Sequence, residues 1–288
     1  MKTADFEYHS PRTLHDATSL LTALYDQDAR ILAGGQSLVP AMAFRLAQPR
    51  HLIDINGVEG LDTLRVDDGK LVVGACVRHA AFHRSVVAGP LGDILSNVAH
   101  HIAHYPIRAR GTFCGSLAHA DPASEWCLVA TTLNASMVAA SVRGERLIAA
   151  EDFFAGLMTT TLEDDEILKE VHIPLPAAGT VYGFYEFNRR AGDFAIASAL
   201  TAGRLVDGKI TDIRVGLGGV EACPRHVPEA AAILEGASPS EEVFKAAGQA
   251  AADAIDPLED QQADAAYRRD LTGTVIRRAL RQSFGTRI

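Results

Sequence analysis

The chain has 288 residues, of which 48% are hydrophobic and 22% are charged, and its formal net charge is −9. This length allows one large domain or two moderate ones, each with its own core. An acidic chain without a long basic run argues against a nucleic-acid-binding surface. No apolar stretch reaches the roughly 18 residues that a membrane span needs. We therefore expect a globular protein that binds no nucleic acid and has no membrane span.

The cysteines and the first residues predict a cytoplasmic location. Residues 1–6 lack the apolar core of a signal peptide. The four cysteines form no CxxC pair, which argues against a zinc or iron–sulfur site in this chain. Reduced thiols are the expected state of such scattered cysteines. They are Cys76, Cys114, Cys127 and Cys223.

The first half of the chain alternates between helical and strand-like patterns. Leu14, Ala17, Leu21 and Leu24 recur at helical spacing, and Thr13 is placed to cap that helix. Further along, Pro106 is expected to end a helix. In chain order, the predicted elements are a helix at 14–24, a strand at 31–32, a helix at 38–46, strands at 51–55 and 71–73, a helix at 91–104, and a strand at 167–174.

The pattern changes after Pro174, Pro176 and Gly179, where we place a domain boundary. Asp207-Gly208 is a two-residue hairpin signal between strands at 204–206 and 210–217. Three helices should follow, and Tyr267, Leu271, Val275 and Ala279 mark one face of the last. The fold class is therefore α+β, with a C-terminal antiparallel sheet backed by helices. The three helices are expected at 228–234, 241–254 and 263–283.

Two glycine-containing loops are the most informative local features. The first, Ala33–Ser37, follows a short strand and precedes a helix, and the second spans Gly111–Ser116. Glycines let a ligand approach the main chain, and free N–H groups at the start of a helix attract anions. Neither loop contains a lysine, so backbone amides and the Ser37 and Ser116 hydroxyls would do the binding. Together the loops predict a site for a long diphosphate ligand, whereas either alone could be a capped turn.

The titratable residues give no metal or catalytic site. His79 and His83 lie four residues apart, as do His100 and His104, but no carboxylate is spaced to complete a metal site. We interpret these histidines as surface or helix-end residues. We identify no catalytic residue.

The motifs in combination resemble the FAD-binding medium subunits of the molybdenum hydroxylases, the family that includes the medium subunit of aerobic carbon monoxide dehydrogenase and the FAD subunit of xanthine dehydrogenase. The resemblance covers essentially the whole chain. The segments that carry it are residues 32–38, 45–47, 51–56, 107–122, 189–195 and 215–220.

The resemblance implies a bipartite FAD-binding domain of the vanillyl-alcohol-oxidase (PCMH) type over residues 1–177, with subdomains at about 1–56 and 57–177. A small α+β domain of the carbon monoxide dehydrogenase flavoprotein type would follow over residues 178–288.

The resemblance also implies which residues bind FAD. Glu125 would bind a cofactor hydroxyl and Leu168 would be an apolar neighbour of the flavin. Phe194 would lie near the isoalloxazine ring, although a core position is the alternative. Asp121 and Glu125 are one helical turn apart and would cap the next helix or bind cofactor hydroxyls. The implied cofactor-binding residues are Leu32, Ala33, Gly34, Gly35, Gln36, Ser37, Leu38, Ile102, Gly111, Thr112, Cys114, Gly115, Ser116, Ala120, Asp121, Glu125, Leu168, Asp193 and Phe194.

Cys114 departs from the family pattern, because the second loop is commonly Thr-Ile-Gly-Gly. A side chain here requires either main-chain angles that suit cysteine or a loop standing farther from the ligand. A space-filling thiol and a redox thiol are the two interpretations of its role.

The function implied by the resemblance is electron transfer within a heterotrimer that itself dimerises. A large molybdopterin subunit would act on the substrate, a small 2Fe–2S subunit would relay electrons, and FAD in this chain would pass them to an external acceptor. Two alternatives remain open: a self-contained FAD oxidoreductase, and a non-catalytic module that binds a nucleotide or coenzyme A. The substrate and the acceptor are not determined by these residues.

Overall fold

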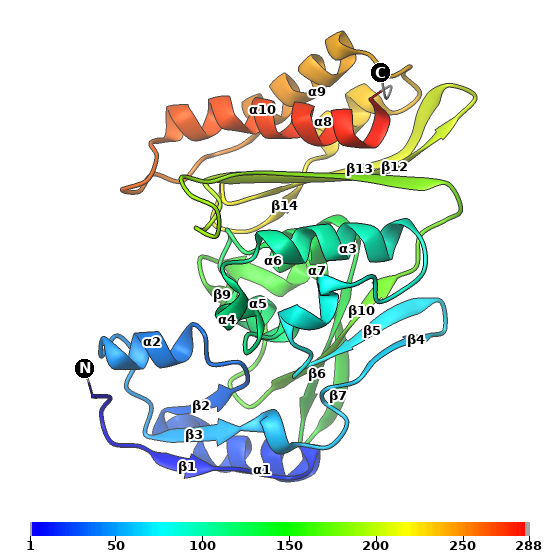
Figure 1. The fold of residues 1–288 in the computed structure, drawn as a ribbon. Coiled ribbons are helices and arrows are strands. Elements are labelled where there is room, and N and C mark those ends of the chain that lie inside the picture. The colour runs from blue at the N-terminus through cyan, green and yellow to red at the C-terminus, as the bar shows by residue number, and fades with distance from the viewer. Residues whose placement is uncertain (1, 286–288) are drawn as a thin grey trace.

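The computed structural model describes residues 2–285. Along its length it stacks three units: a small parallel sheet near the N-terminus, a larger antiparallel sheet with helices, and a second antiparallel sheet covered by helices (Figure 1). This arrangement confirms the α+β fold class. Within the described chain, no helix is both long enough and apolar enough to cross a membrane.

The N-terminal unit is a parallel sheet in the order β1-β3-β2. Thr13 caps α1 as predicted, since its Oγ1 accepts a hydrogen bond from the Asp16 amide at 3.1 Å. Because the strands are parallel, the carboxyl ends of β2 and β3 meet at one edge, where the first glycine loop begins. The elements are β1 (Glu7–His9), α1 (Leu14–Leu24), η1 (Tyr25–Gln27), β2 (Ala29–Leu32), α2 (Leu38–Ala43) and β3 (His51–Asp54).

The helix predicted at 38–46 is shorter than expected. It ends at Ala43, and Arg45 adopts a left-handed conformation with φ of 59°, which interrupts the helix. Within the predicted range, Met42 is buried, whereas Leu46 is 84% exposed.

The middle unit contains an antiparallel sheet in the order β4-β5-β10-β6-β7. Trp126 packs between Phe82 and Phe113, with ring centroids 5.0 and 4.6 Å away, and these three buried rings centre its core. The elements are η2 (Ile55–Gly57), β4 (Leu64–Asp67), β5 (Lys70–Gly74), η3 (His79–His83), α3 (Pro90–His101), α4 (Tyr105–Arg108), α5 (Phe113–His119), α6 (Glu125–Thr132), β6 (Ser136–Ser141), β7 (Gly144–Ala149), α7 (Ala150–Phe153), β8 (Phe154–Gly156), β9 (Thr159–Thr160) and β10 (Ile167–Pro174).

The helix predicted at 91–104 ends earlier, and for a different reason. It stops at His101, because Ala103 has a φ of 39° that no α-helix accommodates. Pro106 lies in the first turn of the next helix, α4, where a missing N–H costs little. The prediction that Pro106 ends the helix was therefore wrong.

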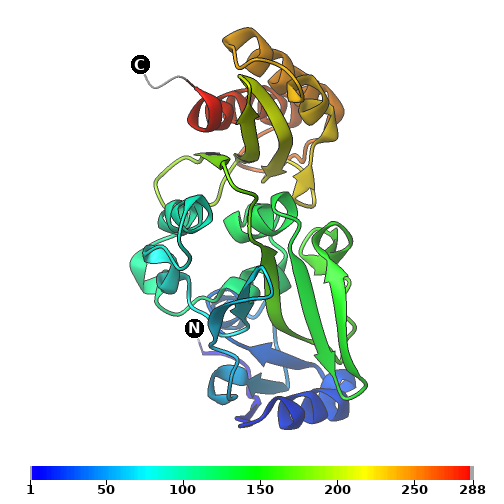
Figure 2. The ribbon, with the colours of Figure 1, turned by 90° about the vertical axis from the view of Figure 1, so that its right-hand side faces the viewer.

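The C-terminal unit is an antiparallel sheet in the order β11-β12-β13-β14, with its three helices on one face and the middle unit on the other (Figures 1 and 2). Asp207 and Gly208 form the predicted hairpin, with φ of 50° and 74°. The elements are β11 (Thr180–Phe187), β12 (Ala197–Val206), β13 (Lys209–Gly218), β14 (Arg225–His226), α8 (Pro228–Leu234), α9 (Glu241–Ala254) and α10 (Ala265–Phe284).

The buried face of α10 differs at one position from the prediction. Leu271, Val275 and Ala279 are buried against the sheet, but Tyr267 is 43% exposed and its ring packs edge-on against Phe187. Tyr267 therefore belongs to the margin of the helix and not to its buried face.

Candidate functional site

A cavity of about 650 Å³ lies where the three units meet. Its volume is within the range of small-molecule sites. Its walls come from both glycine loops, the segment after α3, the link between α5 and α6, β10, and the loop at 192–194.

The structure brings nearly all of the predicted site residues together. Ala120 is the exception: it is buried at the end of α5, with a φ of 53°, and does not line the cavity. The predicted residues that line the cavity are Leu32, Ala33, Gly34, Gly35, Gln36, Ser37, Leu38, Ile102, Gly111, Thr112, Cys114, Gly115, Ser116, Asp121, Glu125, Leu168, Asp193 and Phe194.

The first loop presents free backbone amides to this cavity. Gly35 has a φ of 69°, which turns the chain from β2 into α2. Across residues 2–285, no oxygen accepts a hydrogen bond from the amides of residues 34–38. The next amide, that of Val39, is engaged, because it donates to the Gly35 carbonyl at the start of α2. Gln36 folds back and donates from Nε2 to the Gly34 carbonyl at 2.9 Å. The loop is thus held in shape while its amides stay available for an anion.

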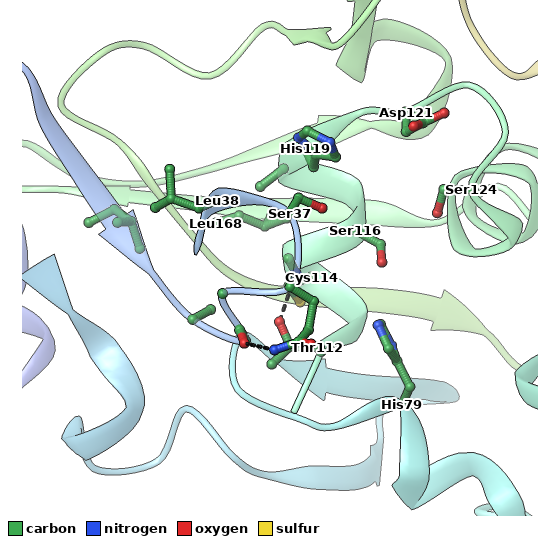
Figure 3. A pocket seen from close by; sticks show the side chains of 18 of the residues that line it. Ser37, Leu38, His79, Thr112, Cys114, Ser116, His119, Asp121, Ser124 and Leu168 are labelled. Atoms are coloured by element: carbon green, nitrogen blue, oxygen red, sulfur yellow. Dashed lines mark hydrogen bonds between the residues drawn. The ribbon is translucent and has the colours of Figure 1, made fainter. Parts of the chain in front are cut away.

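The second loop is internally bonded instead. Thr112 caps α5, accepting at Oγ1 from the Gly115 amide at 3.0 Å. The Phe113 amide donates to the Val77 carbonyl at 3.0 Å, and the Phe113 ring lies in the aromatic core. This anchoring makes the second loop a rigid wall for the site. Figure 3 shows Thr112, Cys114 and Ser116 of this wall beside the pocket.

The two loops touch each other. A Cβ built on Gly34 would lie 2.5 Å from the Arg110 carbonyl oxygen and 2.6 Å from the Gly111 Cα. Real Cβ atoms do not approach backbone so closely, so only glycine permits this contact.

A hydrogen-bonded clamp, formed by Asn56 and Arg78, fastens the loops from behind. Asn56 Nδ2 donates to the Ala33 carbonyl of the first loop at 2.8 Å, and Asn56 Oδ1 accepts from Arg78 Nη2 at 2.6 Å. Arg78 Nη1 donates to the Arg110 carbonyl, beside the second loop. The clamp fixes the spacing of the loops, and the sequence analysis did not identify it.

Cys114 lies within the helical turn of α5, so its main-chain angles suit cysteine. Its thiol is buried and donates to the Val73 carbonyl at 3.4 Å. Burial raises the pKa of this thiol well above its ordinary value. A buried, protonated thiol favours the space-filling interpretation over the redox one.

Glu125 begins α6 and is 5% exposed. Burial, reinforced by the nearby charge of Asp121, raises the pKa of Glu125 to about 7. Asp121 Oδ1 accepts from the Ala123 amide at 2.9 Å, so Asp121 stabilises the turn before α6. Glu125 can therefore donate or accept a hydrogen bond near neutral pH.

A second buried carboxyl, Glu186 on β11, was missed by the sequence analysis. Burial, together with the charge of Glu125, raises the pKa of Glu186 to about 8. Asn188 Nδ2 donates to Glu186 Oε1 at 2.6 Å and also contacts the Asp193 carbonyl at 3.3 Å. Asn188 thereby links the buried carboxyl to the loop that carries Phe194.

The apolar residues occupy different parts of the wall. Leu168 on β10 is 5% exposed, whereas Phe194 is 56% exposed at the rim. The alternative interpretation of Phe194 as a core aromatic is therefore wrong.

His79 and His83 both take part in hydrogen bonds within the protein. His79 is buried on the cavity wall at the start of η3, so of the two interpretations it is a helix-end residue and not a surface residue. His83 stacks on His100, with ring centroids 4.9 Å apart, and accepts from Arg108 Nε at 2.8 Å.

Comparison with known proteins matches both parts of the chain to family models. Residues 4–176 match the FAD binding domain in molybdopterin dehydrogenase, and residues 182–283 match the CO dehydrogenase flavoprotein C-terminal domain. The chain belongs to the FAD-binding medium subunits of the molybdenum hydroxylases. Its cofactor is FAD, and it is the flavoprotein subunit of a molybdopterin-dependent enzyme.

Individual relatives of this medium subunit match along nearly their whole lengths. The chain is 40% identical to the nicotine 6-hydroxylase medium subunit of Paenarthrobacter nicotinovorans, covering 97% of this chain and 98% of the relative. The carbon monoxide dehydrogenase structure from Hydrogenophaga pseudoflava aligns with a TM-score of 0.94 at 34% identity and 98% coverage of both chains. Quinoline 2-oxidoreductase from Pseudomonas putida 86 aligns with a TM-score of 0.91 at 36% identity, again covering 98% of each chain.

Proposed function

We propose that the cavity between the two glycine loops is the FAD site and that this chain transfers electrons from a 2Fe–2S subunit to an external acceptor. The observation that carries the proposal is the contact of the loops at Gly34, beside five consecutive backbone amides without a partner in residues 2–285. Such amides bind a diphosphate without basic side chains. The cavity volume and its mixed polar and apolar walls fit a dinucleotide.

Each wall has a separate task in this proposal. The amides of residues 34–38 hold the diphosphate, and the capped second loop closes the other side. Glu125, with its raised pKa, exchanges hydrogen bonds with a cofactor hydroxyl. Leu168 and Phe194 contact the flavin ring, and the exposure of Phe194 leaves the ring edge open to an acceptor.

The bound FAD supplies the chemistry, because it accepts two electrons and releases them to the acceptor. The chain orients the cofactor and excludes water from its buried side. We propose a large molybdopterin subunit and a small 2Fe–2S subunit as partners in a dimerised heterotrimer in the cytoplasm. We also propose that residues 1–177, with subdomains 1–56 and 57–177, form the FAD-binding domain and that residues 178–288 form the second domain.

The native complex provides the test. Affinity purification from the source cells, followed by mass spectrometry and metal analysis, should recover two further chains with molybdenum, iron and one FAD per medium subunit. Removal of FAD should stop reduction of a quinone or NAD while leaving substrate-driven bleaching of the iron–sulfur absorbance. A fully active oxidoreductase composed of this chain alone would contradict the proposal. A preparation that binds coenzyme A and no FAD would favour the non-catalytic alternative.

A further inference from the structure

His79 is a buried imidazole on the wall of the cavity, at the start of η3 (Figure 3). It is 4% exposed, and its amide donates to the Gly111 carbonyl at 3.0 Å. The ring is held in place by Trp126, whose Nε1 donates to His79 Nδ1 at 2.9 Å. Its orientation is therefore set by the core and not by solvent.

The hydrogen bond from Trp126 fixes the tautomer of this ring. An indole N–H can only donate, so His79 Nδ1 must be the acceptor and carries no proton. The imidazole is neutral near pH 7, because burial, and then the charges of Arg78 and Arg108, lower the pKa of His79 to about 4. A neutral imidazole without a proton on Nδ1 must carry it on Nε2.

The Nε2–H group has no acceptor within residues 2–285. It lies over Gly111, since a Cβ built on that glycine would be 2.5 Å from Nε2. The absence of a side chain at Gly111 keeps this donor uncovered beside the second loop. Nε2 is not one of the fully buried atoms that lack a partner, so its N–H can be reached from the cavity that His79 lines. The donor is therefore available to an acceptor that arrives with a ligand.

We propose that His79 is a further cofactor-binding residue, which donates a hydrogen bond from Nε2 to an oxygen or nitrogen acceptor of the bound dinucleotide. The inference rests on the proposed FAD site. It adds a side-chain donor beside the second loop, in which the amides of Gly111, Phe113 and Gly115 already bond within the protein. Because the donor is neutral, its hydrogen bond should be insensitive to pH above about 5.

Two substitutions test the roles of the two ring nitrogens of His79 separately. His79→Asn keeps an oxygen near the Nδ1 position to accept from Trp126 but has no donor that reaches the Nε2 position. His79→Gln is long enough to place an N–H near Nε2. Each variant is purified in its native complex, stripped of FAD, and titrated with FAD by quenching of flavin fluorescence. We expect His79→Asn to raise the Kd roughly 10-fold and His79→Gln to raise it less than about 3-fold.

The matched control is His83→Asn, because His83 is nearby but does not line the cavity. It should leave the Kd unchanged. Thermal melting of the FAD-free complexes tests for a merely structural effect, which would change the melting temperature and the Kd of both His79 variants in parallel. An unchanged Kd in His79→Asn, with wild type binding FAD normally, would overturn the role of His79 alone. A wild-type complex that takes up no FAD would instead overturn the proposed function.

Discussion

The two glycine loops lie against each other but are built in opposite ways. The first keeps five consecutive amides without an acceptor in the described structure, and its helix α2 is short and fully buries only Met42. In the second, the Gly115 and Ser116 amides bond to Thr112 and the Phe113 amide bonds to Val77, and the loop is anchored through the Phe113 ring in the core. We infer that the first loop supplies binding groups and the second supplies rigidity. Substitutions in the first should therefore change affinity, and substitutions in the second should change both affinity and stability.

The largest effect is expected at the contact between the loops. Gly34→Val would force the first loop away from Arg110 and Gly111 and misalign its amides. Losing two well-aligned amide hydrogen bonds should raise the Kd for FAD roughly 100-fold, with little change in the melting temperature of the FAD-free complex. Gly156→Val is the control, because a Cβ there meets nothing within 4 Å. Equal Kd values for the two variants would refute the loop contact as a binding determinant.

The buried carboxyl of Glu125 should make the stability of the protein depend on pH. The pKa of Glu125 in the folded chain is about 7, above its ordinary value of 4.5. Its protonated form therefore favours folding below pH 4.5, and this contribution is lost as the pH rises through 7. Glu125→Gln should raise the free energy of unfolding by on the order of 2 kcal/mol at pH 8 and by little at pH 4.5.

Unfolding of the FAD-free protein by urea at both pH values measures this difference. Glu59→Gln, at an exposed position, serves as the control and should unfold with the wild-type pH dependence, because it keeps Glu125. A Glu125→Gln variant that unfolds with the wild-type pH dependence would show that this carboxyl is not held protonated.

Loss of the cap on α5 should affect stability and binding together. Thr112→Val removes the acceptor for the Gly115 amide and should cost about 1 kcal/mol. Thr13→Val removes a similar cap from α1, away from the cavity, and should cost about the same. We expect only Thr112→Val to weaken FAD binding, by a few-fold in a fluorescence titration. The proposed rigidity of the second loop fails if both variants bind FAD like wild type.

The smallest effect is expected at Cys114. Cys114→Ala removes a buried thiol with one weak hydrogen bond and should lower stability by about 1 kcal/mol. The flavin reduction potential and the rate of acceptor reduction should stay at wild-type values, since a buried protonated thiol takes no part in electron transfer. A loss of electron transfer without a loss of bound FAD would restore the redox interpretation.

Local sequence patterns were sufficient for the loops, the hairpin at Asp207-Gly208 and most helices. A glycine after a strand, or a two-residue turn signal, reports conformation through the residues themselves. The ends of α2 and α3 were misjudged because Arg45 and Ala103 take left-handed angles that their residue types do not announce.

The deeper parts of the site needed the tertiary structure. His79 meets Trp126 across 47 residues of sequence, and Arg78 meets Asn56 across 22, so no local pattern marks them. Glu186 likewise acquires its raised pKa from burial between the sheet and the middle unit. The pattern of apolar residues could not predict whether Phe194 is buried or exposed. Its exposure at the rim depends on the position of its loop in the folded chain.

The flavin content of the native complex tests the central claim most directly. Visible absorbance and released FAD should give about one FAD per medium subunit for wild type, and Gly34→Val should lose most of it while the complex remains assembled. A Gly34→Val complex that retains a full complement of FAD would contradict the placement of the cofactor between the two loops.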